Sequence, residues 1–130
     1  MTSIPVSFDT YDQLESGHAQ MVAKLSVSGE DVLQRIDAHQ LEVNHMALGV
    51  AGEAGELVDA VKKFIYYNQP IDLENVVEEL GDLEFYMQGL RARLGISRER
   101  TLAANMAKLA KRYPNFEYSN QRAKERADKE

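Results

Sequence analysis

Two pairs of acidic residues stand out in this sequence because the spacing within each pair suits a shared chemical task. Glu53 and Glu56 form the first pair, and Glu79 and Asp82 form the second. Residues three positions apart on a helix lie on the same face, so each pair should project its carboxylates together. Carboxylates gathered in a partly dry cleft must either take up protons or bind cations. Because oxygen ligands suit hard divalent cations, we predict a Mg²⁺ site at which Mn²⁺ can substitute.

A helical hairpin would bring the two acidic pairs to the same level. Apolar residues at helical spacing predict one helix over about residues 39–67 and another over about 73–94. Pro70 cannot continue the first helix, which places the turn between the two. Glu56 lies about as far before this turn as Glu79 lies after it. An antiparallel arrangement of the two helices would therefore gather four carboxylates.

Three glycines lie in the helical segment that carries the first acidic pair. Gly49, Gly52 and Gly55 each cost roughly 1 kcal/mol relative to alanine inside a helix. Gly81 lies between the acids of the second pair. Two explanations fit, since small residues either let helices pack closely or leave room for a bulky ligand. The sequence leaves both explanations open.

The remaining segments also show helical periodicity, and the alternation typical of strands is scarce. We expect a helix over about residues 8–25, a short helix near Val32 and a helix over about 98–112, while residues 115–130 resemble a polar tail. The sequence thus predicts an all-α antiparallel bundle of four to five helices in a single domain over residues 1–114. Because so thin a structure exposes much apolar surface, we expect oligomerisation to complete the bundle.

Composition narrows the classes of function. The 130-residue chain has a net charge of −6, which disfavours general nucleic-acid binding, and it has no cysteine, which excludes disulfides and thiolate metal sites. Neither acidic pair has a histidine at the Glu-x-x-His spacing of di-iron bundle proteins, so redox iron chemistry is disfavoured. No apolar run approaches the roughly 20 residues that span a bilayer, and the start lacks the pattern of a signal peptide. We therefore expect a cytoplasmic protein without a membrane segment.

Acidic and basic residues are unevenly distributed along the chain. Residues 44–90 contain nine acids and two bases, whereas residues 91–112 contain seven bases and one acid. An acidic centre beside a basic segment could hold cations and a small polyanion together. The alternative is a set of solvated helix faces that attract one another.

The stretches that carry the acidic pairs resemble a known enzyme superfamily. GVAGEAGELVDAVKK followed by VVEELGDLEFYMQGL is similar to the all-α nucleoside triphosphate pyrophosphohydrolase superfamily, in its MazG-like branch. The resemblance covers about Leu41 to Pro114, includes NMAKLAKRYP downstream, and places the metal-site core at about residues 41–112. The superfamily signature is Glu-x-x-Glu, a spacer, then Glu-x-x-Asp, which falls here on Glu53, Glu56, Glu79 and Asp82.

The resemblance implies a Mg²⁺-dependent enzyme. Such an enzyme hydrolyses a nucleoside or deoxynucleoside triphosphate between its α and β phosphates, giving a monophosphate and pyrophosphate, for house-cleaning or nucleotide-pool control. All four acids would hold the metal, and Glu53 or Glu56 would be the catalytic group that takes the proton of the attacking water. The resemblance also implies a homodimer or a dimer-of-dimers tetramer.

Phosphate groups need further polar partners. Lys63 lies seven residues after Glu56, on nearly the same helix face. Asn105, Lys108 and Arg112 recur at helical spacing on the later helix, and the resemblance supports the first two most directly as phosphate or sugar contacts. The alternative for each is a solvated side chain.

Two further interpretations stay open at this point. Asp59 lies three residues beyond Glu56 and could extend the row of acids as a reserve ligand. The chain as a whole could instead be a non-catalytic helical module that binds a metal or a partner. Turnover of a triphosphate distinguishes the enzyme from the module.

Overall fold

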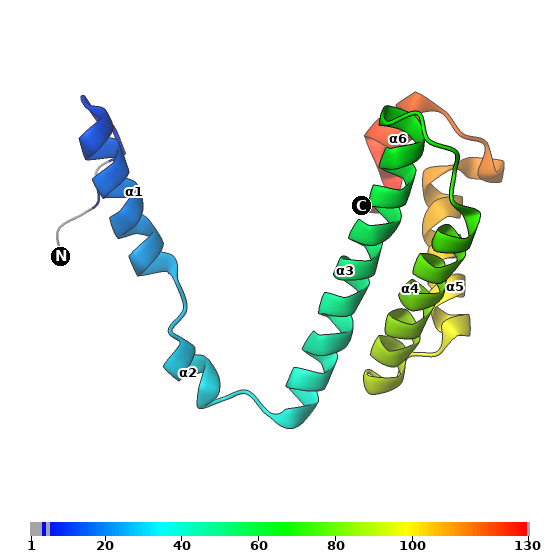
Figure 1. Cartoon of the computed structure of the whole chain (residues 1–130), viewed down its shortest axis with the longest axis horizontal. Helices are drawn as coiled ribbons and strands as arrows, with labels where there is room; N and C mark the ends of the chain where they lie inside the picture. Colours follow the sequence, from blue (N-terminus) through cyan, green and yellow to red (C-terminus); the bar gives the residue numbers. More distant parts are fainter. Residues whose placement is uncertain (1–3, 5, 130) are drawn as a thin grey trace. The chain divides into compact units, whose positions relative to one another are not determined.

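The computed structural model describes residues 4 and 6–129, and these residues form helices and turns without a strand (Figure 1). The all-α class predicted from the sequence is confirmed. The chain divides into two compact units, one up to Asp37 and one from Ala38 onward. None of the helices in the described residues has both the length and the apolar character that crossing a membrane requires.

The first unit contains two helices, α1 (Tyr11–Leu25) and α2 (Gly29–Leu33). Ser28 caps α2, because its side-chain oxygen accepts a hydrogen bond from a backbone N–H of the first turn. Gly17 is the buried residue of α1, and the ring of Phe8 packs directly on it. The segment before α1 therefore folds back onto that helix.

The second unit begins with two long helices, α3 (Ala38–Tyr66) and α4 (Leu73–Arg93), and continues with α5 (Arg98–Arg112). These bounds lie within one residue of those predicted from the sequence. Asp72 caps α4 and Ser97 caps α5, each by accepting a hydrogen bond from the backbone N–H three residues later.

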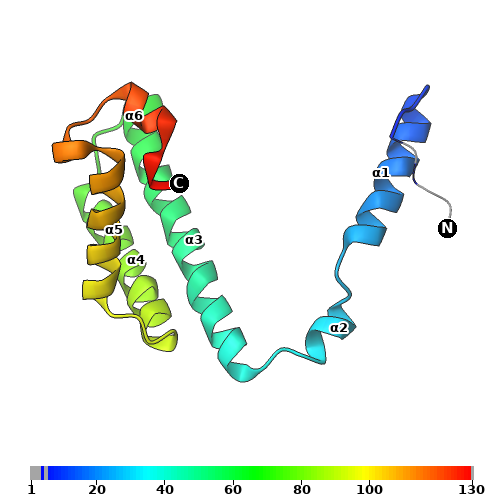
Figure 2. The same ribbon diagram turned by 180° about the vertical axis from the view of Figure 1, so that it is seen from behind.

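Helices α3 and α4 form an antiparallel hairpin whose register is set by large side chains packed on glycines (Figures 1 and 2). The ring of Tyr86 lies against Gly49, and the sulfur of Met46 lies against Gly89. A step of three residues back along α3 is matched by an equal step forward along α4, as an antiparallel pair requires. The close-packing explanation thus holds for Gly49.

Polar contacts fix the end of the hairpin where α3 begins and α4 ends. His39 Nε2 donates to the backbone carbonyl of Arg93 at 2.8 Å. The Arg93 Nε atom lies 3.5 Å from a carboxylate oxygen of Glu42. Both contacts join the first two turns of α3 to the last residue of α4, so they hold the same register as the glycine contacts.

The hairpin buries few of its apolar side chains. Met46 and Ala60 are the buried apolar residues among those described, whereas Val58 is 66% exposed, Phe85 64% and Leu48 63%. Apolar side chains in a stable domain core are normally covered on most sides. A single copy leaves these faces uncovered, and the predicted oligomerisation stays a prediction.

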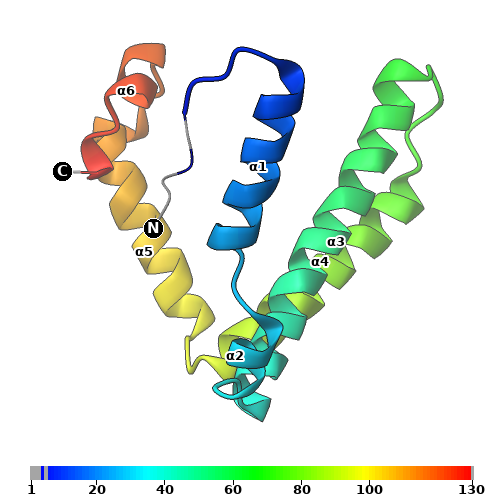
Figure 3. The ribbon, with the colours of Figure 1, turned by 90° about the vertical axis from the view of Figure 1, so that its left-hand side faces the viewer.

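The segment expected to form a polar tail contains three short helical elements, η1 (Pro114–Phe116), α6 (Asn120–Glu125) and η2 (Ala127–Lys129). They pack beside α5 (Figure 3). Arg112 donates two hydrogen bonds to the Asp128 carboxylate, from Nε at 2.6 Å and from Nη2 at 2.7 Å. The Asp128 side chain is only 2% exposed, so a largely buried ion pair anchors this segment to α5.

Substituting alanine at two glycines of α3 should have opposite effects on stability. A Cβ at Gly49 would overlap the ring of Tyr86, whereas nothing lies within 4 Å of a Cβ built at Gly52. We expect Gly49→Ala to lower the free energy of unfolding by about 1–3 kcal/mol. Gly52→Ala should raise it by roughly 0.5–1 kcal/mol through helix propensity. Urea denaturation of both variants checks this, and an equal loss in both would contradict the assigned register.

Asp128→Asn should weaken the attachment of the C-terminal segment in a pH-dependent manner. The Arg112 guanidinium lowers the pKa of Asp128 from 3.8 to about 2. A carboxyl whose pKa is lowered by folding stabilises the protein above its unfolded pKa, and this contribution is lost as the pH falls through the folded pKa. The difference in thermal midpoint between wild type and Asp128→Asn should therefore be full above about pH 5 and shrink towards pH 2. A difference that persists undiminished at pH 2 would speak against the ion pair.

Candidate metal centre

The register of α3 and α4 brings acids from the two helices together. One carboxylate oxygen from each of Glu53, Glu79 and Asp82 lies within 4.8 Å of the other two. Glu53 follows Gly49 by one helical turn and Asp82 precedes Tyr86 by one turn, so the packing of that glycine and ring positions the acids. Glu53 and Glu79 are half-buried and Asp82 is exposed. The predicted meeting of acids across a hairpin is present for these three residues.

The crowding is clearest at Glu79, whose pKa is raised. Burial of the carboxyl is the largest cause, followed by the charges of Glu56, Glu53 and Asp82 and by a hydrogen bond shared with Glu53. Glu56 therefore lies close enough to act on Glu79 electrostatically, although its oxygens are outside the closest group. The four predicted acids thus share one electrostatic environment.

The donor set of this cluster suits a hard divalent cation. Every side chain in it offers carboxylate oxygen, the ligand type preferred by Mg²⁺ and Mn²⁺. A cation between the acids would also relieve the repulsion that, after burial, contributes to the raised pKa of Glu79. On donor chemistry and on charge, the residues present fit the predicted metal.

The lysines nearest in sequence are engaged by a different acid. Asp59 lies 2.7 Å from the Lys63 ammonium and 3.0 Å from that of Lys62. These contacts lower the pKa of Asp59, through Lys63 first and Lys62 second, and raise the pKa of both lysines. Asp59 therefore forms ion pairs with two lysines of the protein, whereas the reserve metal ligand predicted from the sequence would face the acids.

Among the predicted substrate-binding residues, Lys63 lies close enough to Glu56 for the charge of that acid to contribute to its raised pKa, after the larger effect of Asp59. Lys63 belongs to the hairpin and its side chain is 52% exposed. Asn105 and Lys108 are exposed on α5, which packs mainly against the C-terminal elements. Arg112 is held by Asp128, which raises the pKa of the guanidinium.

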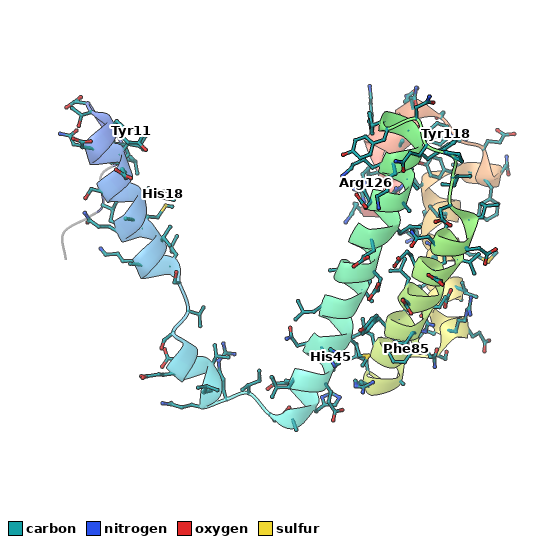
Figure 4. All side chains as sticks on the ribbon, in the orientation of Figure 1. Tyr11, His18, His45, Phe85, Tyr118 and Arg126 are labelled. Carbon is teal, nitrogen blue, oxygen red and sulfur yellow. The ribbon has the colours of Figure 1, made fainter. Side chains whose placement is uncertain are left out.

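An aromatic row lies on the half of the hairpin towards the start of α3, where Figure 4 labels His45 and Phe85. The rings of His45 and Tyr86 meet edge to face at 6.1 Å, and those of Phe85 and Tyr86 at 5.2 Å. Because the Tyr86 ring also lies against Gly49, its contacts are those of a packed residue.

Sequence reasoning missed a polar pocket at the turn between α3 and α4. The pocket measures about 290 Å³, and its walls include Gln69 and Asn75. A signal was present, since Asn75 precedes Glu79 by one helical turn and therefore shares its helix face. The sequence could not show that the turn leaves a hollow there.

Comparison with protein-family models matches residues 41–116 to the MazG nucleotide pyrophosphohydrolase domain. The match spans more than half of the 130-residue chain and includes all four acids of the centre. Comparison with curated proteins and with solved structures gives no match. The family resemblance noted in the sequence is thereby confirmed.

Glu79→Gln should raise thermal stability in the absence of metal and abolish stabilisation by Mg²⁺. The raised pKa of Glu79 means that folding disfavours its ionised form, and an amide of the same shape removes this penalty at neutral pH. The amide also removes a charged ligand. In a thermal melt, Mg²⁺ at about ten times its dissociation constant should raise the wild-type midpoint by a few degrees and leave Glu79→Gln unchanged.

Glu78→Gln is the matched control, because Glu78 is the adjacent acid and lies outside the close group. It should respond to Mg²⁺ as the wild type does. A Mg²⁺ response that survives in Glu79→Gln would remove this residue from the metal centre.

Proposed function

We propose that this chain, which belongs to the MazG nucleotide pyrophosphohydrolase family, hydrolyses nucleoside or deoxynucleoside triphosphates between the α and β phosphates. The products are a nucleoside monophosphate and pyrophosphate, and the role is nucleotide house-cleaning or pool control. The observation that carries the proposal is the convergence of Glu53, Glu79 and Asp82 within the segment that matches the family. A cluster of carboxylates cannot bind a triphosphate directly, so the proposal includes Mg²⁺, with Mn²⁺ as a substitute.

The proposed ligands of Mg²⁺ are the four acids Glu53, Glu56, Glu79 and Asp82. When bound there, the metal would neutralise charge on the phosphate oxygens and make water a better nucleophile. Packing locks the two helices in register, and the helices hold the carboxylates of the cluster in place. Two features of the fold thus support the proposal, the fixed positions of the donors and their uncompensated charge.

Proton transfer falls to an acid at the edge of the cluster. In the overall reaction water adds across the phosphoanhydride, one P–O bond forms and one breaks, and the proton of water leaves to a base. Glu53 and Glu56 are the proposed catalytic bases. Glu56 is the more exposed of the two and stands outside the closest oxygen group, which supports giving it this role.

The remaining phosphates require cationic and polar contacts from other parts of the fold. We assign this role to Lys63, Asn105, Lys108 and Arg112. Lys63 and Arg112 are held by Asp59 and Asp128 respectively, so a phosphate would replace a carboxylate at each of them. Asn105 and Lys108 are exposed and need no such exchange.

A second copy of the chain is part of the proposal. An apolar groove of about 450 Å³ runs along α3, and its walls include Val58, Val61 and Ile65, which are 66%, 39% and 59% exposed. A hairpin with so little buried apolar surface gains too little free energy to offset chain entropy. The proposed assembly is a homodimer or a dimer of dimers that covers these faces.

The test is incubation with Mg²⁺ and a panel of nucleoside and deoxynucleoside triphosphates, with products separated by ion-exchange chromatography. We expect a monophosphate and pyrophosphate in equal amounts, and a loss of at least about 100-fold in kcat for Glu56→Gln if it is the base. Glu78→Gln should retain activity. Release of orthophosphate would refute the proposed bond cleavage. Metal binding without turnover of any triphosphate would favour the non-catalytic module.

A further inference from the structure

The pocket at the turn between α3 and α4 offers a binding site next to the acids. It has a volume of about 290 Å³ and is lined by Ala60, Lys63, Gln69, Pro70, Asp72 and Asn75. Ligand pockets for whole drug-sized molecules begin at about 300 Å³, so this one suits a fragment such as a base or a sugar.

The charges around the pocket are already balanced within the protein. The Lys63 ammonium lies 2.7 Å from Asp59, and the Asp72 carboxylate accepts the N-cap hydrogen bond of α4 at 3.1 Å. With Lys63 paired to Asp59, the pocket presents no unpaired cation, and Lys63 would contact a phosphate only after exchanging that carboxylate. The chemistry of the pocket favours a neutral, polar group.

Two side-chain amides are available for recognition in the pocket. Within residues 4 and 6–129, the amides of Gln69 and Asn75 have no hydrogen-bond partner in the protein. Each amide offers a carbonyl acceptor and an NH₂ donor. Groups of this kind complement the donor and acceptor edge of a base, and a site built to pair with such an edge rejects analogues that lack it.

The pocket also lies at the right distance from the metal centre. Ala60 follows Glu56 by four residues and Asn75 precedes Glu79 by four, so both wall residues stand one helical turn from the acids. Four residues correspond to about 6 Å along a helix. A nucleoside joined to a phosphate at the acids can span this distance.

We propose that the turn pocket holds the nucleoside end of the substrate, and that the amides of Asn75 and Gln69 select the base. The inference rests on the proposed function, since it assigns a place to one part of that substrate. It makes Asn75 and Gln69 binding residues that set specificity, and it gives the phosphates to the metal centre.

The experiment compares wild type, Asn75→Ala, Gln69→Ala and the control Asn44→Ala, an exposed asparagine of α3 outside the pocket. One readout is kcat/KM for each triphosphate of the panel, and the other is binding of each nucleoside monophosphate by calorimetry. Losing one base contact should lower kcat/KM about 5- to 10-fold for the preferred nucleotide and much less for the others. The monophosphate of the same base should bind correspondingly more weakly, and Asn44→Ala should match wild type in both readouts.

Two results would overturn the inference. An equal loss for every nucleotide would show that the pocket holds a part common to all, such as the phosphates, and unchanged preference in both variants would show that it holds none. If wild type forms no monophosphate from any triphosphate, the proposed function fails, and the pocket is then tested by calorimetry alone. In that case the inference also fails if no nucleoside monophosphate binds, or if neither substitution changes the affinity for it.

Discussion

The close approach of carboxylates on two facing helices is the constraint on which the candidate site in the second unit depends. Glu53, Glu79 and Asp82 lie close together, and the pKa of Glu79 is raised first by its burial and then by the charges of its acidic neighbours. The ring of Tyr86 on Gly49 and the contacts at the far end of the hairpin hold the two helices, and with them the acids, in this register. The acids are thus held in a state whose charge calls for a cation.

The basic side chains that form ion pairs do so with acids other than those of the cluster, so these ion pairs do not neutralise the cluster. Each basic residue with an ion pair in the described part of the chain is matched to an acid outside the cluster: Lys62 and Lys63 to Asp59, Arg112 and Arg126 to Asp128, Arg91 and Arg98 to Glu84, and Arg93 to Glu42. The same pairing keeps the turn pocket near neutrality. Under the proposed function, the phosphates bound at the metal centre and the base bound in the turn pocket would lie apart along the hairpin.

The glycines near the acids serve two different purposes. Gly49 is required by the ring of Tyr86, since a Cβ there would overlap it. Gly52, Gly55 and Gly81 have nothing within 4 Å of an added Cβ, so packing within one copy does not explain them. The space they leave beside the acids suits a second copy or the substrate, and both belong to the proposed function.

The sequence by itself determined the helices, their caps and the family. Apolar spacing located α3 and α4 to within one residue, because periodicity and cap chemistry are local properties that neighbouring residues encode. The acids could also be predicted, since equal distances from one turn imply equal heights on an antiparallel pair. The prediction of one domain over residues 1–114 and the roles of individual site residues stay predictions.

Only the tertiary structure decided which charged groups from distant parts of the chain meet. Arg112 was assigned to phosphate from its helical spacing, yet it pairs with Asp128, sixteen residues later, because the C-terminal segment folds back on α5. Asp59 also differs from its predicted role as a reserve ligand, because it pairs with Lys62 and Lys63 on its own helix, and helical spacing alone could have predicted those pairs. The Arg112–Asp128 pair and the pocket at the turn depend instead on how the chain reverses direction in space, and spacing along a helix carries no information about that.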